Sequence, residues 1–267
     1  MPNPFYASID QMGFPVTLEK RPERIISLVP SQTEFLYDLG LEEKIVGLTK
    51  FCVHPQNLRK TKQIVGGTKS FKFDVIARLK PDLIIGNKEE NYKEGIEALK
   101  TKYNVWMSDI NTLEQAFSMM EEVGVLVDKK PKSVEIIDVI RSSFDRLHLS
   151  VDKKALYLIW QNPFMSVGIN TFIDEMMRKC GFENVIKDHE RYPIITEADI
   201  RKLSPDIILL SSEPFPFKEK HLKEFQLKFP ETEIALVDGE LFSWYGSRLL
   251  YSAAYFHEIY TKHKPAY

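Results

Sequence analysis

The sequence predicts an α/β protein of two similar lobes joined by one long helix. Short apolar runs of strand length alternate with helical segments throughout, which is typical of mostly parallel sheets covered by helices. Residues 76–89 align without gaps with residues 200–213, at an offset of 124 at both ends. A glycine-free helical segment, 131–149, separates the two halves. We therefore expect an N-terminal lobe at 1–126, a linking helix within 127–152 and a C-terminal lobe at 153–267.

The composition is that of an ordinary globular protein. The chain has 267 residues, enough for two domains with their own cores, and is 43% hydrophobic and 28% charged. A net charge of −2 gives no electrostatic reason to expect nucleic acid as a partner. No segment approaches the roughly 20 apolar residues that span a bilayer. The two cysteines, Cys52 and Cys180, fall in different halves, so we expect free thiols.

The first half begins with an arm at 5–22 and an apolar run at 25–29, read as a buried parallel strand. Ser31 and Glu34 have capping-box spacing, which predicts a helix from Ser31 to a C-cap at Gly40. Further strands are expected at 45–47, 82–85 and 105–107. The intervening helices are expected at 74–79, up to about residue 102, and from residue 112 onward.

The linking segment 131–149 has the properties of a stiff helix. Proline at its start suits the first turn, where a missing N–H costs nothing. Apolar residues recur at helical spacing and form one stripe: Val134, Ile137, Ile140, Phe144 and Leu147. With no glycine, the segment contains no residue that favours a bend, and we expect a rigid connector about 28 Å long.

The second half repeats the first. Residues 154–159 parallel 24–29, and Asp238 closes a strand as Asp109 does. A last helix is expected at 247–262. In open parallel sheets, ligands bind beyond the carboxyl ends of the strands. Glu89 and Glu213 hold the same post-strand position in their lobes, so we expect both at a cleft between the lobes, where two-domain proteins commonly bind ligands.

The chain resembles the helical-backbone, or class III, periplasmic-type substrate-binding proteins of ABC importers for cobalamin, iron–siderophores and haem. The resemblance rests on ordered motifs over about nine-tenths of the chain: RIISLVPS at 24–31, GLEEKIVG at 40–47, LKPDLII at 79–85 and KALYL at 154–158. The cobalamin-binding branch is the most similar, judged by GGT at 66–68 and GFENV at 181–185.

This resemblance implies two Rossmann-like lobes bridged by one helix, with little closure on binding. It also implies an acidic docking residue for the transporter on each lobe, here Asp74 with Glu197 or Asp199. Family members are periplasmic or cell-surface proteins. The N-terminus has no basic region followed by an apolar run, so the sequence leaves a cytoplasmic location open. The partners expected are a small metal chelate and an ABC permease, and we expect a monomer.

Cys52 and His54 put a thiol and an imidazole on one side of an extended segment, a pattern that suits zinc, copper or cobalt. A lone pair lacks the further ligands of a structural zinc site. The alternative is a buried cysteine and a histidine bonded to backbone, and the sequence leaves metal ligation open. The other histidines show no partner spacing and are expected on the surface: His148, His189, His221, His257 and His263.

The remaining candidates follow predicted strands. Glu89, Glu90 and Asn91 form a charged turn, whose alternative is a solvated helix start. Glu213 precedes Phe215 and Phe217, which two prolines are expected to hold outward. Trp244 and Tyr245 offer stacking faces, and Arg248 a guanidinium for a carboxylate or phosphate, unless it pairs with an internal acid. Trp160 and Phe164 are expected to line the opposite wall.

The function that these features favour is non-catalytic binding of a metal chelate: a corrinoid such as cobalamin, an iron–siderophore or a haem-like ligand. No cofactor is required, since the chelate is the cargo. The alternative is a cytosolic metal-handling protein or enzyme on the same scaffold, using Cys52, His54 and the carboxylates of the cleft. The sequence contains no G-x-S-x-G elbow and no phosphate-binding loop.

Overall fold

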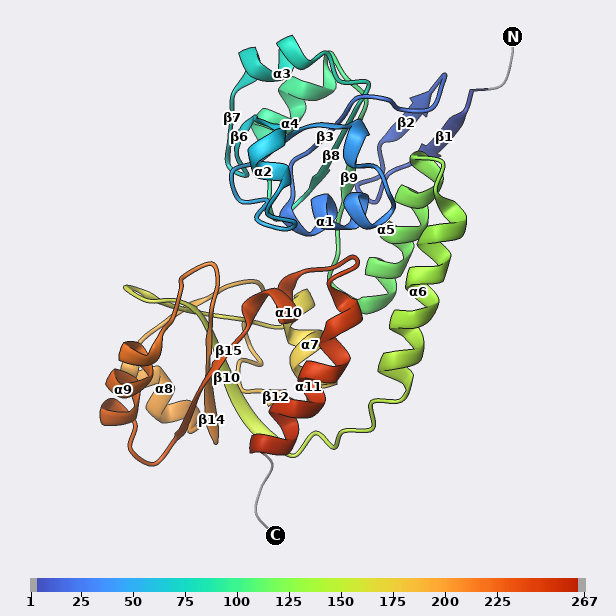
Figure 1. The fold of residues 1–267 in the computed structure, drawn as a ribbon. Coiled ribbons are helices and arrows are strands. Elements are labelled where there is room, and N and C mark those ends of the chain that lie inside the picture. Colours follow the sequence, from blue (N-terminus) through green and yellow to red (C-terminus); the bar gives the residue numbers. More distant parts are fainter. Residues whose placement is uncertain (1–3, 264–267) are drawn as a thin grey trace. The chain divides into compact units, whose positions relative to one another are not determined.

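The computed structural model describes residues 4–263 and divides the chain into two compact units (Figure 1). Unit 1 takes the chain up to Ile110, then Glu114–Val139 and the short segment Tyr245–Arg248. Unit 2 takes Asn111–Leu113, Ile140–Trp244 and the chain from Leu249 onward. The segment Tyr245–Arg248 therefore comes from late in the sequence but belongs to the N-terminal unit.

Unit 1 contains a five-stranded parallel sheet of order β5-β4-β3-β8-β9. Its strands are β3 (Ile25–Ser27), β4 (Ile45–Leu48), β5 (Gln63–Ile64), β8 (Leu83–Asn87) and β9 (Val105–Ser108). Its helices are α1 (Pro30–Asp38), η1 (Glu42–Lys44), α2 (Leu58–Thr61), α3 (Phe73–Leu79), α4 (Lys93–Lys100) and α5 (Leu113–Leu126). Two hairpins complete it: β1 (Tyr6–Ile9) with β2 (Pro15–Leu18), and β6 (Gly66–Gly67) with β7 (Ser70–Phe71).

The core of unit 1 explains why its strands read as continuous apolar runs. Ile26 of β3 and Ile84 of β8 pack in one cluster with Ile76 of α3 and Ile96 of α4. All of β8 is buried, as expected for a strand covered on both faces. The β1–β2 hairpin is fixed by buried Asp10, whose carboxylate accepts hydrogen bonds from two hairpin amides and from the Met107 amide of β9.

Helix α1 begins one residue earlier than predicted, and the predicted capping box is wrong. Val29 is the N-cap and makes no side-chain cap, while Pro30 occupies the first turn. Ser31 therefore lies inside the helix, and Glu34 pairs with Arg248 instead of reaching back to the N-terminus. The local spacing predicted that Glu34 caps this helix, but in the structure Glu34 pairs with Arg248, which is distant in the sequence.

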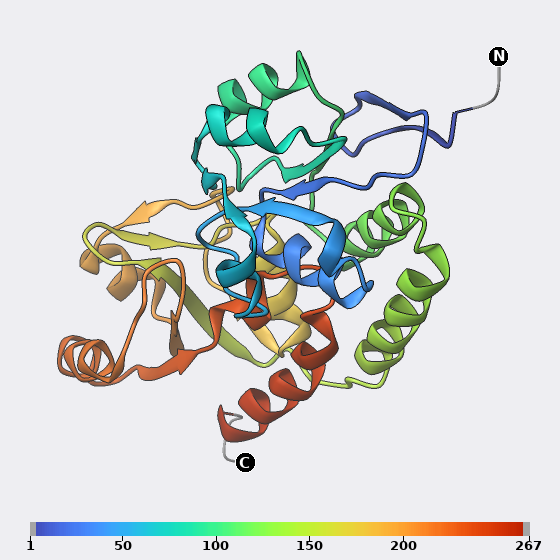
Figure 2. The ribbon, with the colours of Figure 1, turned by 45° about the horizontal axis from the view of Figure 1, so that its top comes forward.

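The linking helix α6 spans Lys130–Asp145, four residues shorter at its C-terminus than predicted. Ile140 and Phe144 are buried as the apolar stripe required. The amide of Leu147 closes a turn onto Phe144, after which the chain is irregular up to β10. Helices α5 and α6 run side by side (Figures 1 and 2), since Gly124 of α5 leaves room for Ser133 of α6.

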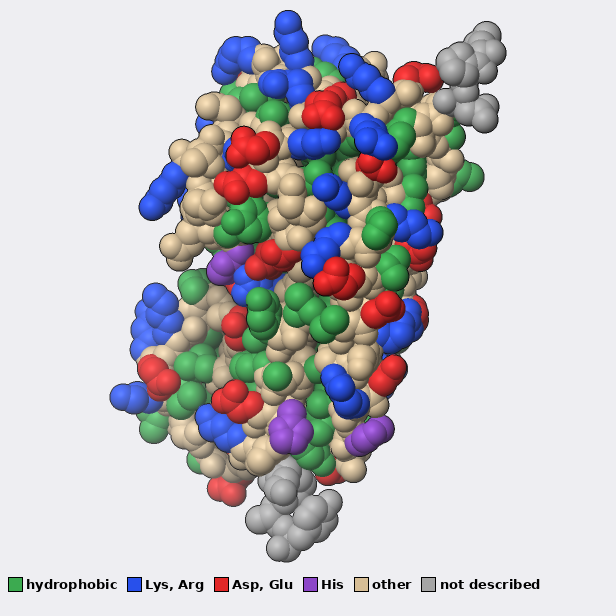
Figure 3. Space-filling view, turned by 45° about the vertical axis from the view of Figure 1, so that its right-hand side comes forward, with side chains coloured by type: hydrophobic (Ala, Val, Ile, Leu, Met, Phe, Trp, Pro, Cys, Tyr) green, Lys and Arg blue, Asp and Glu red, His purple; other side chains and the backbone are tan. Residues whose placement is uncertain are grey.

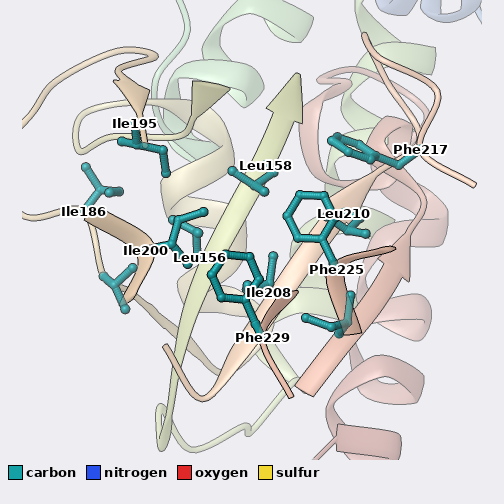
Figure 4. Close-up of a cluster of buried hydrophobic side chains, with 12 residues drawn as sticks. Leu156, Leu158, Ile186, Ile195, Ile200, Ile208, Leu210, Phe217, Phe225 and Phe229 are labelled. Carbon is teal, nitrogen blue, oxygen red and sulfur yellow. The ribbon is translucent and has the colours of Figure 1, made fainter. Parts of the chain in front are cut away.

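Unit 2 contains a mixed sheet of order β13-β11-β10-β14-β15, with β12 also paired to β10. Its strands are β10 (Lys153–Trp160), β11 (Phe164–Ser166), β12 (Phe182–Asn184), β13 (Ile194–Ile195), β14 (Ile207–Ser211) and β15 (Glu233–Val237). Its helices are α7 (Phe172–Lys179), α8 (Glu197–Leu203), α9 (Glu219–Lys228), α10 (Gly239–Ser243) and α11 (Leu249–His263). Strands β10, β12, β14 and β15 are parallel, and β11 and β13 are antiparallel additions. Figure 4 shows Leu156, Ile208 and Phe225 in the apolar cluster of this unit.

The repeat detected in the sequence is present in the structure, element by element. The bounds of α3 and α8 differ by 124 residues at both ends, as do those of β8 and β14. Both helices end on a left-handed residue, Lys80 and Ser204, directly before a proline that disfavours continuing the helix. The following aspartates accept a backbone hydrogen bond at the start of the neighbouring strand: Asp82 from Arg24, and Asp206 from Lys154.

Candidate functional site

The strands of each parallel sheet end at a common edge, which is where open α/β sheets bind ligands. We call the residues that follow β3, β4, β8 and β9, together with 66–70 and 245–248, the unit 1 edge. We call the residues that follow β10, β14 and β15 the unit 2 edge. The two edges are described separately below.

Cys52, on the unit 1 edge, is a buried thiol. Its sulfur lies 3.1 Å from the Thr33 hydroxyl and 3.3 Å from the Thr49 hydroxyl. Burial raises the pKa of the thiol, which disfavours the thiolate that ligates metals. Within residues 4–263, no group of three or more His, Cys, Asp or Glu side chains is placed to hold a metal ion. This surrounding matches the structural alternative that the sequence left open for Cys52.

The turn Lys88–Asn91 is held by amide side chains. The side-chain oxygen Oδ1 of Asn87 accepts from the Glu89 and Glu90 backbone amides, at 2.8 and 3.1 Å. Buried Asn91 donates to the carbonyls of Leu28 and Thr68. Glu89 is half-buried with its Oε1 enclosed, and Glu90 is exposed as a residue while desolvation raises the pKa of its carboxyl. Asn87 and Asn91 therefore fix the turn that carries the two glutamates.

Arg248 forms a bidentate ion pair with Glu34 of α1. Nε lies 2.9 Å from Oε2 and Nη2 lies 2.6 Å from Oε1, with side chains only 15% and 13% exposed. Burial raises the pKa of Glu34, and the hydrogen bond and charge of Arg248 oppose that rise. His54 is half-buried and its charge also acts on Glu34. The pair fastens Tyr245–Arg248 to α1, with Tyr245 buried alongside.

The unit 2 edge brings Glu213 and Trp244 together. Glu213 Oε1 accepts from the Trp244 indole at 2.8 Å and from the Ser243 hydroxyl at 2.7 Å. Gly239 leaves the space for this arrangement, because a Cβ there would lie 2.8 Å from Glu213 Cγ. The sequence predicted both residues for the site, and the structure adds the bond between them.

Aromatic side chains line the same edge. Trp160, 39% exposed, meets Phe215 edge-to-face at 5.6 Å between ring centroids. Phe217 packs behind Phe215 and is only 5% exposed, so the prediction that it points outward is wrong. Phe225 of the core contacts both Phe217 and Phe164, and the apolar pocket it provides is what draws Phe217 inward.

Two histidines expected on the surface are buried. His221 packs edge-on against Phe215 and Phe217, and its Nδ1 accepts from the Lys218 amide. Burial lowers its pKa. His263 ends α11 and pairs with Glu233. Neither position shows a sequence spacing that would have revealed its partner.

Strand-end position indicates Phe51, in the loop 51–55 after the predicted strand 45–47, as a residue of this edge. It follows β4, is 49% exposed, and its ring lies 4.9 Å from the Lys50 ammonium. Gly67 presents bare backbone to the ring, since a Cβ there would lie 3.3 Å from it. An aromatic residue directly after a strand, next to Cys52, was the available signal.

The acidic residues predicted for docking lie on α3 and α8. Asp74 is exposed and pairs with Arg78 at 2.9 Å. Glu197 pairs with Lys228 at 2.5 Å, and Asp199 forms a capping box with Thr196, whose hydrogen bonds lower the Asp199 pKa. By the 124-residue offset, the position equivalent to Asp74 is Ala198. The two helices therefore differ in where they carry acid.

Comparison with known proteins identifies the family. Residues 25–234 match the family described as periplasmic binding protein, which is well over half of the chain. The chain belongs to this family. Among curated relatives, an uncharacterized ABC transporter substrate-binding lipoprotein of Bacillus subtilis, YvrC, is 26% identical over 73% of this chain and 65% of its own length. The vitamin B12-binding protein of Vibrio parahaemolyticus is 24% identical over 78% of this chain and 75% of its own.

Solved structures share the fold. A periplasmic haem-binding protein from Pseudomonas aeruginosa matches with a TM-score of 0.75 and 20% identity, covering 92% of this chain and 95% of that one. A protein of the Fe3+-hydroxamate transport system of Saccharomonospora viridis matches with a TM-score of 0.74 and 18% identity, covering 96% and 98%. The predicted family and two-lobed α/β fold are confirmed, and the alternative of an enzyme has no support among these relatives.

The described residues contain no helix long and apolar enough to cross a membrane. Acidic and basic side chains are interspersed over the face shown in Figure 3, in keeping with the net charge of −2.

Proposed function

We propose that this protein is the substrate-binding component of an ABC-type importer and that it binds a small metal chelate without chemical change. The observation that carries the proposal is the unit 2 edge, where exposed Trp160 packs on partly buried Phe215 and a carboxylate is held in place by two hydrogen bonds. Trp160 and Phe215 offer an apolar face, and Glu213 is held in place by Trp244 and Ser243. Family membership and relatives named for vitamin B12, haem and Fe3+-hydroxamate support this ligand class.

The unit 1 edge supplies ligand groups of its own in this proposal. Phe51 offers an exposed aromatic face, and His54, Glu89 and Glu90 offer polar groups on the same edge. Four other predicted residues have a supporting role in this proposal. Cys52 and Asn91 hold loops of unit 1 through hydrogen bonds, Phe217 packs against Phe215, and Phe164 packs against Phe225 of the core. The chelate is cargo, so no resident cofactor enters the proposal.

Calorimetry with purified protein tests the proposal directly. Cyanocobalamin, haem and a ferric hydroxamate are the titrants, because relatives are named for these ligands. We expect one of them to bind at one ligand per chain and to be recovered unchanged. Trp160→Ala should weaken that binding, while Tyr251→Ala, which removes another exposed aromatic side chain of unit 2, should not. Absence of binding across the whole panel contradicts the proposal.

We further propose that the protein works outside the cytoplasm as a monomer and docks on its permease through Asp74. Asp74 is 70% exposed on α3 and pairs with exposed Arg78 of the same helix, whereas Asp199 caps α8 and Glu197 pairs with Lys228 of α9. With the cognate permease in liposomes, Asp74→Ala should lower ligand-stimulated ATPase activity while ligand affinity stays unchanged. Glu94→Ala, on exposed α4, is the matched control. Equal stimulation by the Asp74 variant and the wild type would exclude this docking residue.

A further inference from the structure

We infer that the ligand presents amides or other hydrogen-bond donors at its rim and no carboxylate to the unit 1 edge. This inference rests on the proposed function and narrows its substrate class. The inference depends on Arg248, whose guanidinium the sequence suggested as a binding group for a ligand carboxylate.

The guanidinium of Arg248 is already occupied by a carboxylate of the protein. It meets Glu34 through two parallel bonds, Nε to Oε2 at 2.9 Å and Nη2 to Oε1 at 2.6 Å. Glu34 thereby fills the Nε–Nη2 edge of the planar guanidinium. A ligand carboxylate that took Arg248 would leave Glu34 charged, buried and unpaired, which is strongly unfavourable.

The lysines of the unit 1 edge also have partners. Lys88 lies 2.6 Å from the Asp109 carboxylate. Lys69 donates to the Glu89 carbonyl oxygen. Lys50 lies over the Phe51 ring at 4.9 Å from its centroid. Arg248 and these three lysines therefore each have a contact that a ligand anion would compete with.

Two acidic side chains on one turn of this edge are hydrogen-bond acceptors. The turn is fixed by Asn87 and Asn91. Glu89 is half-buried with its Oε1 enclosed, and Glu90 is an exposed residue whose carboxyl pKa is raised by desolvation, a rise that the charge of Lys69 opposes. Carboxylates accept hydrogen bonds from amide N–H groups and repel ligand carboxylates. The pairing of Arg248 with Glu34 and the acceptors of this turn thus favour a donor-bearing rim.

This separates the ligands for which the relatives are named. A corrinoid carries amide side chains around its ring, and a hydroxamate chelate carries amide groups, whereas haem carries two propionates. We therefore expect the protein to select ligands by the charged or uncharged groups at the periphery of the chelate and not by the metal or the macrocycle.

Ligand pairs that differ only in rim charge test this. The pairs are cyanocobalamin and its monocarboxylic acid, haem dimethyl ester and haem, and the acetylated and succinylated forms of an amine-bearing ferric hydroxamate. Whichever chelate type binds, we expect the carboxylate member to bind at least about tenfold more weakly to the wild type. Equal or tighter binding of the carboxylate member overturns the inference but leaves the proposed function standing. If no member of any pair binds, the proposed function fails and the inference falls with it.

A second experiment uses Glu34→Gln, because this substitution removes the carboxylate that pairs with Arg248. We expect the carboxylate member to gain at least about tenfold in affinity while the uncharged member changes less than about twofold. Glu23→Gln is the matched control, because it breaks an exposed ion pair with Lys44 before β3. Circular dichroism shows whether the Glu34→Gln variant folds. If it does not fold, the ligand pairs measured on the wild type decide the question. A folded Glu34→Gln protein with unchanged discrimination contradicts the role of Arg248.

Discussion

The Trp244 indole donates a 2.8 Å hydrogen bond to Glu213 Oε1, an oxygen that also accepts from Ser243. Trp244 comes from the turn after α10 and Glu213 from the loop after β14, so the bond joins two loops of the unit 2 edge. Because Oε1 has two donors, the carboxylate is held in one orientation. Glu213 is therefore set before a ligand arrives, which lowers the ordering cost of binding.

Trp244→Phe removes the donor and keeps an aromatic ring. We expect the unfolding free energy to fall by about 1.5–3 kcal/mol, since hydrogen bonds to charged groups contribute that much. Ligand affinity should fall about fivefold, the equivalent of roughly 1 kcal/mol of lost positioning. Thermal melts and calorimetry measure the two effects. Full affinity in this variant would show that Glu213 needs no such support.

Gly239→Ala tests whether the position of the Glu213 carboxylate matters for binding, because it crowds the Glu213 side chain. A Cβ at this position would lie 2.3 Å from Ser211 Oγ and 2.8 Å from Glu213 Cγ, so Glu213 must move. We expect a destabilisation of about 1–3 kcal/mol, typical of overpacking, together with weaker ligand binding. A crystal structure of the variant with Glu213 unmoved, or unchanged affinity, would contradict the expectation.

The fold was predictable where the signal is local and repeated. Pro81–Asp82 and Pro205–Asp206 each end a helix and start a strand, so the same pair of residues marks the same junction twice. Short apolar runs between such junctions gave the parallel strands. A stretch of about ten residues contains all the information that these elements require.

The site was predictable only in part, because its pairings are distant in sequence. Glu34 and Arg248 are 214 positions apart, and the local spacing of Glu34 with Ser31 favoured a capping box instead. Phe217 packs on Phe225 and His221 packs on Phe217, and the place of Phe225 depends on how α9 packs on β15. The position of Glu213 and Trp160 after predicted strands was enough to place them at the edge of the sheet. The direction in which a side chain such as that of Phe217 points could be known only from the tertiary structure.

The two cysteines should be unreactive in the native protein. Both are free and buried, and burial raises both thiol pKa values above the ordinary 9.0. A thiol reagent at pH 8 should label neither in native protein and both in guanidinium. The raised values also mean that stability present below about pH 9 falls as the pH rises above it, because only the unfolded chain ionises there. Rapid labelling of native Cys52 would revive a chemical role for it.

Cys52→Ala separates the metal-handling alternative from the binding proposal. The sulfur contacts the hydroxyls of Thr33 and Thr49, and in the described part of the chain no group of three or more His, Cys, Asp or Glu side chains is placed to hold a metal ion. We expect this variant to bind the chelate as the wild type does, with a modest loss of stability, since only a small buried group is removed. Loss of ligand binding in a variant that melts normally would show that the thiol takes part.

Glu233 anchors the end of α11 in unit 2. Its carboxylate pairs with Lys153 at the start of β10 and with His263, and Lys153 also donates to the His263 carbonyl at 2.6 Å. Burial raises the Glu233 pKa, but the hydrogen bonds from Lys153 and His263 outweigh it, so the net pKa is lowered from 4.5. The stabilisation is therefore fully present above about pH 4.5 and is lost as the pH falls through the lowered value.

Glu233→Gln should accordingly lower the unfolding free energy by about 1 kcal/mol at pH 6, a figure discounted for the partial exposure of the group. The difference from wild type should shrink below pH 4.5, where the wild-type carboxyl also becomes neutral. Melting curves of both proteins across pH 3–7 measure this. Ligand affinity should be unchanged, because the cluster lies at the starts of β10 and β15, and the unit 2 edge follows the ends of these strands. A constant difference at every pH would mean that Glu233 acts through packing and not through its charge.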